Sequence, residues 1–411
     1  MNKARHAPSV LETFPVEKGE LMIAGIPITR LAKRVGQTPF YAYDRQNITQ
    51  RTAYLRKHLP DEIHLHYAIK ANPMPAVVQH LAGLVDGFDL ASGGEMRLAL
   101  DTGMSADNIS FAGPGKSTRE IGSAIAAGVT LNLESATELE TVARLGEEQG
   151  IKPRVAVRVN PDFELKSSGM KMGGGPKQFG IDTEQVPAVL KRIGELEQDF
   201  QGFHIFSGSQ NLRPEAIIEA QEKTFALAYR LADDAPSAVY KLNIGGGFGI
   251  PYFPGEQPLE IIPIGERLND LLEEKAKQLP EAKIIIELGR YLVGEAGIYV
   301  CRVVDRKISR GQVYLVTDGG LHHHLAASGN FGQVIRKNYP VLIGNKMENS
   351  ETETVRIVGP LCTPLDILAD NMTLAKAIAG DLVVVFQSGA YGFSASPHHF
   401  LSHPPPLEVL V

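Results

Sequence analysis

The first residue of this sequence that could do covalent chemistry is a lysine at the end of an apolar segment. Lys70 follows the segment His64–Ile69 and precedes Ala71, Asn72 and Pro73. A desolvated lysine amine forms Schiff bases with the carbonyl groups of cofactors and substrates. A solvated or ion-paired lysine is the alternative, and only the surrounding residues can decide between the two.

Three consecutive glycines follow a second apolar segment, at Gly245, Gly246 and Gly247. Because they carry no side chains, their backbone N–H groups can come close to an anion such as a phosphate. A tight turn that only permits close packing is the alternative for this loop.

An acid and a base close a third apolar segment, at Glu287 and Arg290. The carboxylate can keep a heterocyclic nitrogen protonated, and the guanidinium can bind a phosphate through two hydrogen bonds. An internal ion pair between the two residues is the alternative.

Two further candidates lie near the C-terminus. Cys362 stands between Pro360 and Pro364, which favour an irregular loop, and a loop cysteine near a carboxylate can act as an acid or a nucleophile. Tyr391 is flanked by glycines and could offer a hydroxyl to a phosphate. Packing in the core is the alternative for both, and it is our interpretation of Cys301, which lies in an apolar strand pattern.

Three consecutive histidines, His322, His323 and His324, suggest a metal site at first sight. Side chains in an extended segment alternate between two faces, and no acidic or cysteine ligands accompany them at ligand spacing, so we expect no metal. Binding to a substrate carboxylate or phosphate is the favoured interpretation, with a solvated loop as the alternative.

Alternating strand and helix patterns between residues 60 and 290 must position these candidates. Short β-branched segments alternate with Ala/Leu/Glu-rich helical ones, which predicts a parallel α/β fold. We expect eight strands, the number that closes a (β/α)₈ TIM barrel with its active site at the strand C-termini. They are expected near His64–Ile69, Val85–Leu90, Ile109–Ala112, Val129–Leu133, Arg154–Val159, Gly202–Phe206, Lys241–Ile244 and Lys283–Ile286.

A β-rich second domain is predicted after the barrel, where Val- and Ile-rich segments are separated by Gly, Asp and Pro turns. The segments Glu20–Thr29 and Thr38–Tyr43 also have strand patterns, with a short helix expected at Leu31–Val35 between them. We therefore expect the ranges 1–44 for N-terminal strands of the β domain, 45–291 for the barrel and 292–411 for the rest of the β domain. The loops at 169–180 and 322–333 are expected to be the most mobile.

Composition narrows the possible partners. The 411 residues carry a net charge of −6, with 43% hydrophobic and 21% charged residues, so we expect neither nucleic acid nor a membrane as partner. Residues 1–20 lack the apolar core of a signal peptide, and no apolar run reaches spanning length. The two cysteines lie far apart without metal spacing, which fits a reducing cytoplasm.

Taken together and in order, these residues resemble the fold-type III pyridoxal-phosphate (PLP) decarboxylases, the family of diaminopimelate and ornithine decarboxylases. The resemblance runs from Thr38-Pro39-Phe40-Tyr41 to the C-terminus. It implies an alanine racemase-like barrel that binds PLP, an amino-acid decarboxylase activity, and an obligate homodimer with active sites at its interface.

The resemblance also implies roles for the candidate residues. Lys70 would form the Schiff base with PLP, Glu287 would contact the pyridine nitrogen, and Phe206 would stack on the ring. Cys362 would reach the partner subunit's active site and donate a proton to the α-carbon of the substrate. The other implied cofactor ligands are Asp89, Arg158, Ser209, Gly245, Gly246, Gly247, Arg290 and Tyr391. The implied substrate ligands are His322, His323, Arg336, Tyr339, Thr363 and Asp366.

Three departures from the family pattern bear on the substrate. Phe206 occupies the position of the imidazole that stacks on the cofactor, so that face loses the option of a proton or charge. Thr363 follows the cysteine where the family has an acid that pairs with a distal ammonium, which disfavours a diamino substrate. No Arg-Pro stretch follows the turn 318–320 to bind a distal carboxylate.

Stretches at 171–180, 208–212 and 394–401 resemble a subgroup of the family more closely. It contains a decarboxylase of a glutamyl group carried by an acyl carrier protein and decarboxylases encoded with exosortase A systems. The expected activity is therefore α-decarboxylation of a free or carrier-linked amino acid. Diaminopimelate decarboxylation to lysine, an amino-acid racemase and a non-catalytic regulator are the alternatives. An acidic carrier would need a basic docking patch, for which the candidates are Arg302, Arg306, Lys307, Arg310, Arg336 and Lys337.

Overall fold

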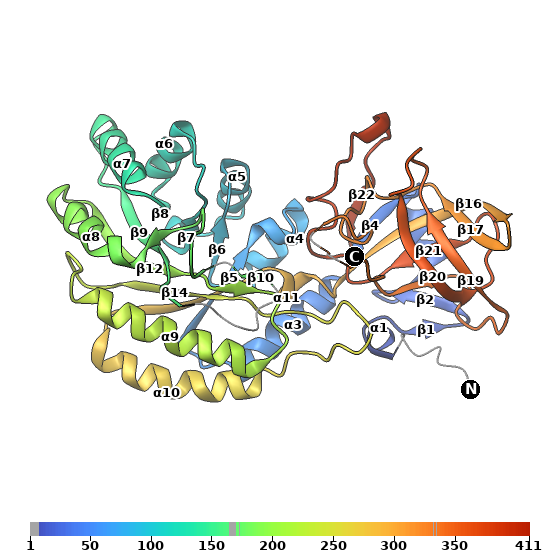
Figure 1. The fold of residues 1–411 in the computed structure, drawn as a ribbon, viewed down its shortest axis with the longest axis horizontal. Coiled ribbons are helices and arrows are strands. Elements are labelled where there is room, and N and C mark those ends of the chain that lie inside the picture. The colour runs from blue at the N-terminus through green and yellow to red at the C-terminus, as the bar shows by residue number, and fades with distance from the viewer. Residues whose placement is uncertain (1–7, 164–169, 172, 332, 334) are drawn as a thin grey trace. The chain divides into compact units, whose positions relative to one another are not determined.

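The structure is a computed structural model that describes residues 8–163, 170, 171, 173–331, 333 and 335–411 (Figure 1). Its contacts divide the chain into two compact units. The barrel unit comprises Arg51–Ile250 and Gln257–Gly289, and the sheet unit comprises Met1–Gln50, Pro251–Glu256 and Arg290–Val411. Parts of both loops expected to be mobile lie outside the described residues.

Eight parallel strands close into a barrel, which confirms the predicted (β/α)₈ fold. The circle closes because β15 pairs with β5 and β8 pairs with β9. The strands are β5 (Ile63–Ala68), β6 (Gly87–Leu90), β7 (Ile109–Phe111), β8 (Thr130–Leu133), β9 (Arg154–Asn160), β12 (Asp199–Ile205), β14 (Lys241–Gly246) and β15 (Lys283–Leu288). The short strands β10 (Met170–Lys171), β11 (Ile181–Asp182) and β13 (Gly208–Ser209) lie outside this circle.

Helices connect the strands, and several begin at a serine that the sequence places before an acid. Ser117 accepts a hydrogen bond from the Glu120 N–H and the Glu120 carboxylate accepts one from the Ser117 N–H, which caps α6 at both backbone groups. The side chains of Ser92 and Ser135 likewise accept hydrogen bonds from the backbone N–H groups of Glu95 and Glu138, at the start of α5 and α7. The helices of this unit are α4 (Pro75–Ala82), α5 (Gly93–Asp101), α6 (Thr118–Ala127), α7 (Ala136–Gln149), α8 (Val186–Glu195), α9 (Pro214–Ala232) and α10 (Ile262–Gln278), with 3₁₀ turns η1 (Ile69–Ala71), η2 (Ala106–Asn108) and η3 (Thr183–Gln185). Helix α3 (Arg45–His58) begins in the sheet unit and ends in the barrel unit.

A mixed β-sheet forms the second unit, as predicted, and it includes strands from both ends of the chain. β4 (Phe40–Tyr43) lies between β16 (Gly297–Ser309) and the last strand, β22 (Leu407–Leu410). The other strands of the sheet are β17 (Gln312–Thr317), β18 (Val341–Ile343), β19 (Thr352–Val358), β20 (Ile367–Ala375) and β21 (Leu382–Val385). α1 (Pro8–Thr13), α2 (Ile28–Val35), α11 (Arg290–Val293) and η4 (Phe400–Ser402) complete the unit, together with a small sheet of β1 (Val16–Glu17), β2 (Glu20–Ile23) and β3 (Ile26–Pro27).

The prediction of one strand over Glu20–Thr29 is wrong. The chain turns back after β2 because Ala24 and Gly25 adopt positive φ angles of 47° and 73°, and β3 pairs antiparallel with β2. The helix expected at Leu31–Val35 is present and begins earlier, at Ile28. The strands predicted after the barrel, at 298–304, 312–317, 354–358, 382–387 and 407–411, do not include β18 or β20. In β20, polar residues and a positive φ of 51° at Asn371 interrupt the apolar pattern. In the described part of the chain, no helix is long and apolar enough to cross a membrane.

Candidate active site

Lys70 lies in the 3₁₀ turn η1, directly after β5 ends at Ala68. Its neighbours Ile69 and Ala71 are 0% and 1% exposed, whereas Lys70 itself is exposed. The Lys70 Nζ lies 5.6 Å from the centre of the Phe206 ring. Two buried residues thus fix the turn, and the amine extends from it toward the aromatic ring that the sequence predicted beside the cofactor.

Glu287 is a buried carboxylate with partners on two neighbouring strands. Its Oε2 lies 3.2 Å from His204 Nε2 and accepts a 3.0 Å hydrogen bond from Asn243 Nδ2. Burial alone would raise the pKa of Glu287, but the close imidazole of His204 outweighs this, with smaller effects of Lys70 and Arg158. The pKa of Glu287 is therefore well below its ordinary value, and the group stays a carboxylate.

His204, which was not among the predicted site residues, is the ion-pair partner of Glu287. The signal was its place on β12, where it pairs in register with Asn243 of β14. Both of its ring nitrogens are buried without a hydrogen-bond partner among the described residues, so its contact with Glu287 is an ion pair. His204 thus belongs to the surroundings of Glu287 rather than to the aromatic stack.

A second group of polar side chains joins neighbouring strands on the other side of β5. Asp89 accepts a short hydrogen bond from Ser110 Oγ, and its Oδ2 lies 3.3 Å from His66 Nδ1. Asn132 Nδ2 donates to Ser110 Oγ over 3.2 Å. The structure therefore places the predicted ligand Asp89 in a buried network that also contains the unpredicted His66.

Arg158 pairs with a carboxylate that the sequence did not assign to it. Its Nη1 donates to Glu134 Oε1 over 2.6 Å, and its guanidinium lies 5.0 Å from the Phe179 ring centre. Burial would raise the pKa of Glu134, but Arg158 and the N–H groups of Gly113 and Gly180 lower it overall. Arg158 is thus held in place before any ligand is considered.

Gly245 and Gly246 are the last residues of β14, and Gly247 follows the strand. Gly245 and Gly247 have φ angles of 70° and 74°, and a β-carbon at Gly245 would lie 3.0 Å from Phe206 Cδ2. The Asn211 N–H donates to the Gly247 carbonyl over 2.9 Å. Glycine is therefore required here both by backbone conformation and by the approach of the Phe206 ring.

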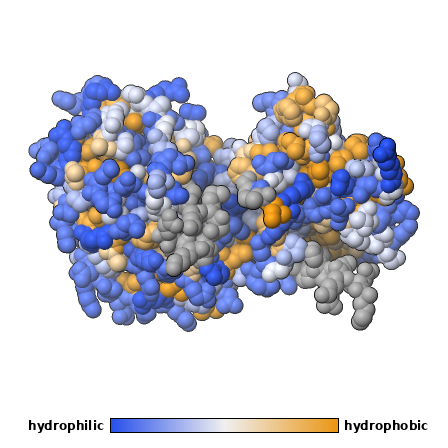
Figure 2. Space-filling model, viewed as in Figure 1, coloured by the Kyte–Doolittle hydropathy of each residue, from blue (hydrophilic) through white to orange (hydrophobic). Residues whose placement is uncertain are grey.

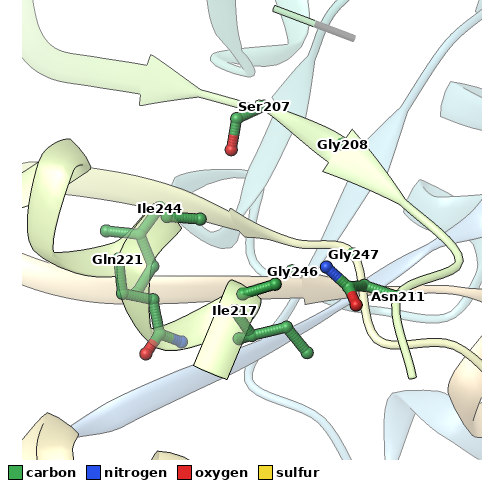
Figure 3. Close-up of a pocket in the computed structure, with 10 residues that line it drawn as sticks. Ser207, Gly208, Asn211, Ile217, Gln221, Ile244, Gly246 and Gly247 are labelled. Atoms are coloured by element: carbon green, nitrogen blue, oxygen red, sulfur yellow. The ribbon is translucent and has the colours of Figure 1, made fainter. Parts of the chain in front are cut away.

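Figure 3 shows a pocket beside this loop, with Ile217 and Gln221 of α9 on one side and Asn211 next to Gly247. Ile244 also lines it, whereas its neighbour Asn243 reaches Glu287. Because successive side chains of a strand point to opposite faces, this pocket lies between α9 and the barrel wall. It is separate from the face that carries Glu287. Ser209, in β13, is half-buried and its backbone pairs with Met170.

In the sheet unit, Arg290 is surrounded by tyrosines. Its Nη1 donates to the Tyr252 hydroxyl over 2.7 Å, and its guanidinium carbon lies 4.7 Å from the ring centre of Tyr391 and 5.3 Å from that of Tyr252. Its Nε is buried without a hydrogen-bond partner in the described residues. Glu287 pairs with His204 instead, so the alternative of an internal ion pair between Glu287 and Arg290 is wrong.

The loop 359–366 of the sheet unit presents Cys362, which is exposed, whereas Leu361 before it is buried. Thr363 Oγ1 accepts a hydrogen bond from the Leu365 N–H over 3.3 Å. Asp366 is 2% exposed, and both its oxygens accept backbone hydrogen bonds. The expected direct contact between Asp366 and substrate does not fit this burial. Cys301 is buried, which raises its thiol pKa well above the ordinary value, and this matches its interpretation as a packing residue.

The three histidines lie in a turn rather than in an extended segment, and all are at most 1% exposed, so the alternative of a solvated loop is wrong. Both ring nitrogens of His323 and of His324 have partners: the Pro404 carbonyl and Tyr299 hydroxyl for the first, the Ser388 hydroxyl and Ala327 N–H for the second. His322 has partners for neither of its nitrogens among the described residues, and its ring lies 3.6 Å from that of His323.

Burial keeps these imidazoles neutral. It lowers the pKa of His322 and of His324 to about 3 and that of His323 to about 4. Neutral rings can donate or accept a hydrogen bond but bring no positive charge to an anion. In the described part of the chain, no group of three metal-ligating side chains is found.

Arg336 and Tyr339, also predicted substrate ligands, lie in the sheet unit. Arg336 Nη1 donates to the Ser328 carbonyl, whereas its Nε and Nη2 are buried without partners among the described residues. Tyr339 is 6% exposed, with its ring 4.8 Å from that of Tyr252 and 5.6 Å from that of His324. Arg336 thus keeps open donors, while Tyr339 packs among aromatic rings.

Comparison with known proteins connects these geometries to a chemistry. Residues 45–294 match the model of the pyridoxal-dependent decarboxylase family, pyridoxal binding domain. The L-glutamyl-[BtrI acyl-carrier protein] decarboxylase of Niallia circulans is 41% identical over 93% of this chain and 90% of its own length. The diaminopimelate decarboxylase of Aquifex aeolicus is 34% identical over 96% of this chain and 91% of its own length. The structure of a diaminopimelate decarboxylase from M. jannaschii with L-lysine superposes with a TM-score of 0.89 at 26% identity, covering 98% of this chain and 93% of that one.

Proposed function

The chain belongs to the pyridoxal-dependent decarboxylases, and from this premise we propose that it decarboxylates a glutamyl group linked to a carrier protein. The chain is a PLP-dependent carboxy-lyase, so the racemase alternative falls away. What remains open to proposal is the substrate, its carrier and the roles of single residues.

The observation that carries the substrate proposal is Thr363, directly after Cys362. A hydroxyl cannot neutralise the distal ammonium of a diamino acid. The relative at 41% identity is a decarboxylase of a carrier-linked glutamyl group, and a glutamyl group has no distal ammonium. The second candidate is diaminopimelate, supported by the relative at 34% identity.

The residues present fit PLP. Glu287 is an ionised, buried carboxylate that would keep the pyridine nitrogen protonated, and Arg290 Nε is a buried donor that suits a phosphate oxygen. When bound, PLP supplies a ring that accepts the bonding electrons as carbon dioxide leaves. Lys70 would hold the cofactor covalently, with Phe206 beside it. The resemblance supports Ser209, the glycine loop and Tyr391 as further phosphate contacts.

We assign the protonation of the α-carbon to Cys362. Its thiol is exposed, so it can donate a proton to a group outside its own subunit. The Cys362→Ala variant should retain PLP and lose turnover or form a wrongly protonated product. Unchanged rate and product would remove Cys362 from the mechanism.

We propose a homodimer in which Cys362 reaches the partner's site. Nine of the thirteen large hydrophobic residues exposed in the described chain belong to the sheet unit, including Leu365 at 59% exposure beside Cys362. Figure 2 shows such apolar residues on the surface of that unit. Exposed apolar surface favours a protein interface. Mixing Lys70→Ala with Cys362→Ala subunits should restore activity, and a monomer at micromolar concentration in analytical ultracentrifugation would contradict the dimer.

A carrier would meet a smaller basic patch than expected. Arg306 is paired with Glu353, and Arg302 donates to the Gly380 carbonyl, whereas Lys307 and Arg310 are exposed. We propose Lys307 and Arg310 as docking residues for an acidic carrier. Charge reversal at both should raise the KM for carrier-linked substrate, while reversal of the exposed Lys191 on α8 should not.

We also propose a cytoplasmic location, because both Cys301 and Cys362 are free thiols, as expected in a reducing compartment.

The deciding experiment is carbon dioxide release from the holoenzyme, screened over free lysine, ornithine, diaminopimelate, glutamate and carrier-linked glutamate. Release from the carrier-linked substrate at a kcat/KM well above that of the free amino acids supports the proposal. Preference for diaminopimelate would establish the second candidate instead.

A further inference from the structure

Asp366 is a buried acid whose two carboxylate oxygens accept hydrogen bonds from two different loops. Oδ1 accepts from the Leu321 N–H over 2.6 Å, in the turn that begins the histidine segment. Oδ2 accepts from the Leu361 N–H over 2.8 Å, in the residue directly before Cys362. The side chain is 2% exposed, so water does not compete for these bonds.

Two glycines make room for this carboxylate. A β-carbon at Gly320 or at Gly359 would overlap the Asp366 carboxylate oxygens. Neither glycine has a positive φ, so the need for glycine here comes from the approach of the acid and not from backbone conformation. The two loops are therefore built around Asp366.

Backbone hydrogen bonds close the Cys362 loop on the same residue. The Gly359 N–H donates to the Asp366 carbonyl and the Asp366 N–H donates to the Thr363 carbonyl, each over 3.2 Å. Cys362 thus lies in a loop whose two ends meet at Asp366. Its own thiol is exposed while Leu361 is buried.

We infer that Asp366 is a positioning residue that holds the Cys362 loop, residues 359–366, against the turn at Leu321. We call this arrangement the Asp366 clamp. This inference rests on the proposed role of Cys362 as proton donor. A carboxylate is needed because each oxygen accepts one N–H, whereas an amide can accept on its oxygen only. The clamp thereby couples the position of the thiol to the turn that carries the histidines.

The test is the rate at which iodoacetamide alkylates Cys362 in the full-length holoenzyme. Cys301 is buried, and a Cys362→Ala sample measures any background from it. Asp366→Asn should raise the alkylation rate about threefold or more, because one of the two loops is released and opens locally. Under the proposed function it should also lower kcat about tenfold with little change in KM, since a positioned proton is lost rather than substrate binding.

Gly320→Ala is the second variant, because its β-carbon displaces the carboxylate while the charge of Asp366 is kept. It should raise the alkylation rate like Asp366→Asn. The matched control is Asp370→Asn in β20, which removes the partner of Arg356 in β19 and should leave the rate unchanged. A rise in Asp366→Asn without a rise in Gly320→Ala would mean a charge effect on the thiol and would overturn the clamp.

Failure of the clamp and failure of the proposed function give different results. If Cys362→Ala decarboxylates normally, the proposed role of Cys362 is wrong, and the alkylation rates still decide whether the clamp exists. If Cys362→Ala is impaired while Asp366→Asn alkylates like the unaltered enzyme, the clamp is refuted and the proton donor stands.

Discussion

Gly289 offers a direct way to displace the turn that carries Lys70 without changing a proposed ligand. A β-carbon at Gly289 would lie 2.8 Å from Ala71 Cβ, 3.2 Å from the Ala68 carbonyl oxygen and 3.4 Å from Ala68 Cβ. Ala68 and Ala71, on either side of Lys70, are 4% and 1% exposed, so neither can move freely into solvent. The Gly289→Ala variant must therefore shift η1 or the end of β15.

The size of the effect follows from the distances. Carbon atoms in contact lie about 3.5–4.0 Å apart, so η1 or the end of β15 must move by roughly 0.7–1.2 Å. Overpacking of this kind costs about 1–3 kcal/mol of folding free energy. A catalytic group misplaced by about 1 Å loses about 10²-fold in rate. We expect a kcat lower by about 10²-fold and a weakened affinity for PLP.

The assays are carbon dioxide release, the visible absorbance of bound PLP and urea unfolding. Gly115→Ala is the matched control, since nothing lies within 4 Å of its added β-carbon. Ala71→Gly introduced with Gly289→Ala removes the closest contact and should restore part of kcat. Normal kcat and PLP affinity in Gly289→Ala, or no rescue by Ala71→Gly, would refute the reasoning.

Four other predictions test separate parts of the protein. Lys70→Ala should abolish both the visible absorbance of bound PLP and turnover, and full-rate decarboxylation in this variant would exclude Lys70 as the covalent residue. Glu287→Gln should keep PLP but lower kcat about 10²–10³-fold in the same assay, because a preorganised charge is lost; a loss below threefold would contradict its role. Thr363→Glu should raise kcat/KM for diaminopimelate relative to carrier-linked glutamate by at least about tenfold, and an unchanged ratio would separate Thr363 from substrate choice. The N–H groups of Gly93 and Ser117 lower the pKa of Glu120 to about 2, so its stabilising effect is complete above its ordinary pKa and is lost as pH falls toward 2. Ser117→Ala should accordingly cost about 1 kcal/mol in urea unfolding at pH 7 and less at pH 3, and an equal cost at both would argue against the capping box.

Much of the barrel could be predicted because its signals are local. A βα unit consists of an apolar strand and an amphipathic helix, and both have short sequence patterns that can be recognised. In a parallel (β/α)₈ barrel, strands that follow one another in the sequence are neighbours in space, so their order can be predicted as well. Lys70 and Glu287 could be placed at strand ends on this basis. The same reasoning missed β20 and merged β2 with β3, because positive φ angles at Asn371, Ala24 and Gly25 interrupt strands without a reliable sequence signal.

Partners of single side chains were less predictable. His204 is separated from Glu287 by more than eighty positions in the chain, and only the neighbouring positions of β12, β14 and β15 bring the two within 3.2 Å. Arg158 pairs with Glu134, and Arg290 with Tyr252, for the same reason. Each of these pairs depends on which face of its segment a side chain occupies. In a strand, a shift of the register by one residue would move the side chain to the opposite face.

The sequence by itself therefore determined the barrel, the mixed sheet, the covalent lysine candidate and the family, because these depend on residue types at fixed spacings. Only the tertiary structure decided that Glu287 is held by His204, that the histidines at 323 and 324 are internally bonded, and that Asp366 faces inward between two loops. These depend on burial and on contacts between distant segments, where the loss of water makes each unpaired polar group costly and so dictates its partner.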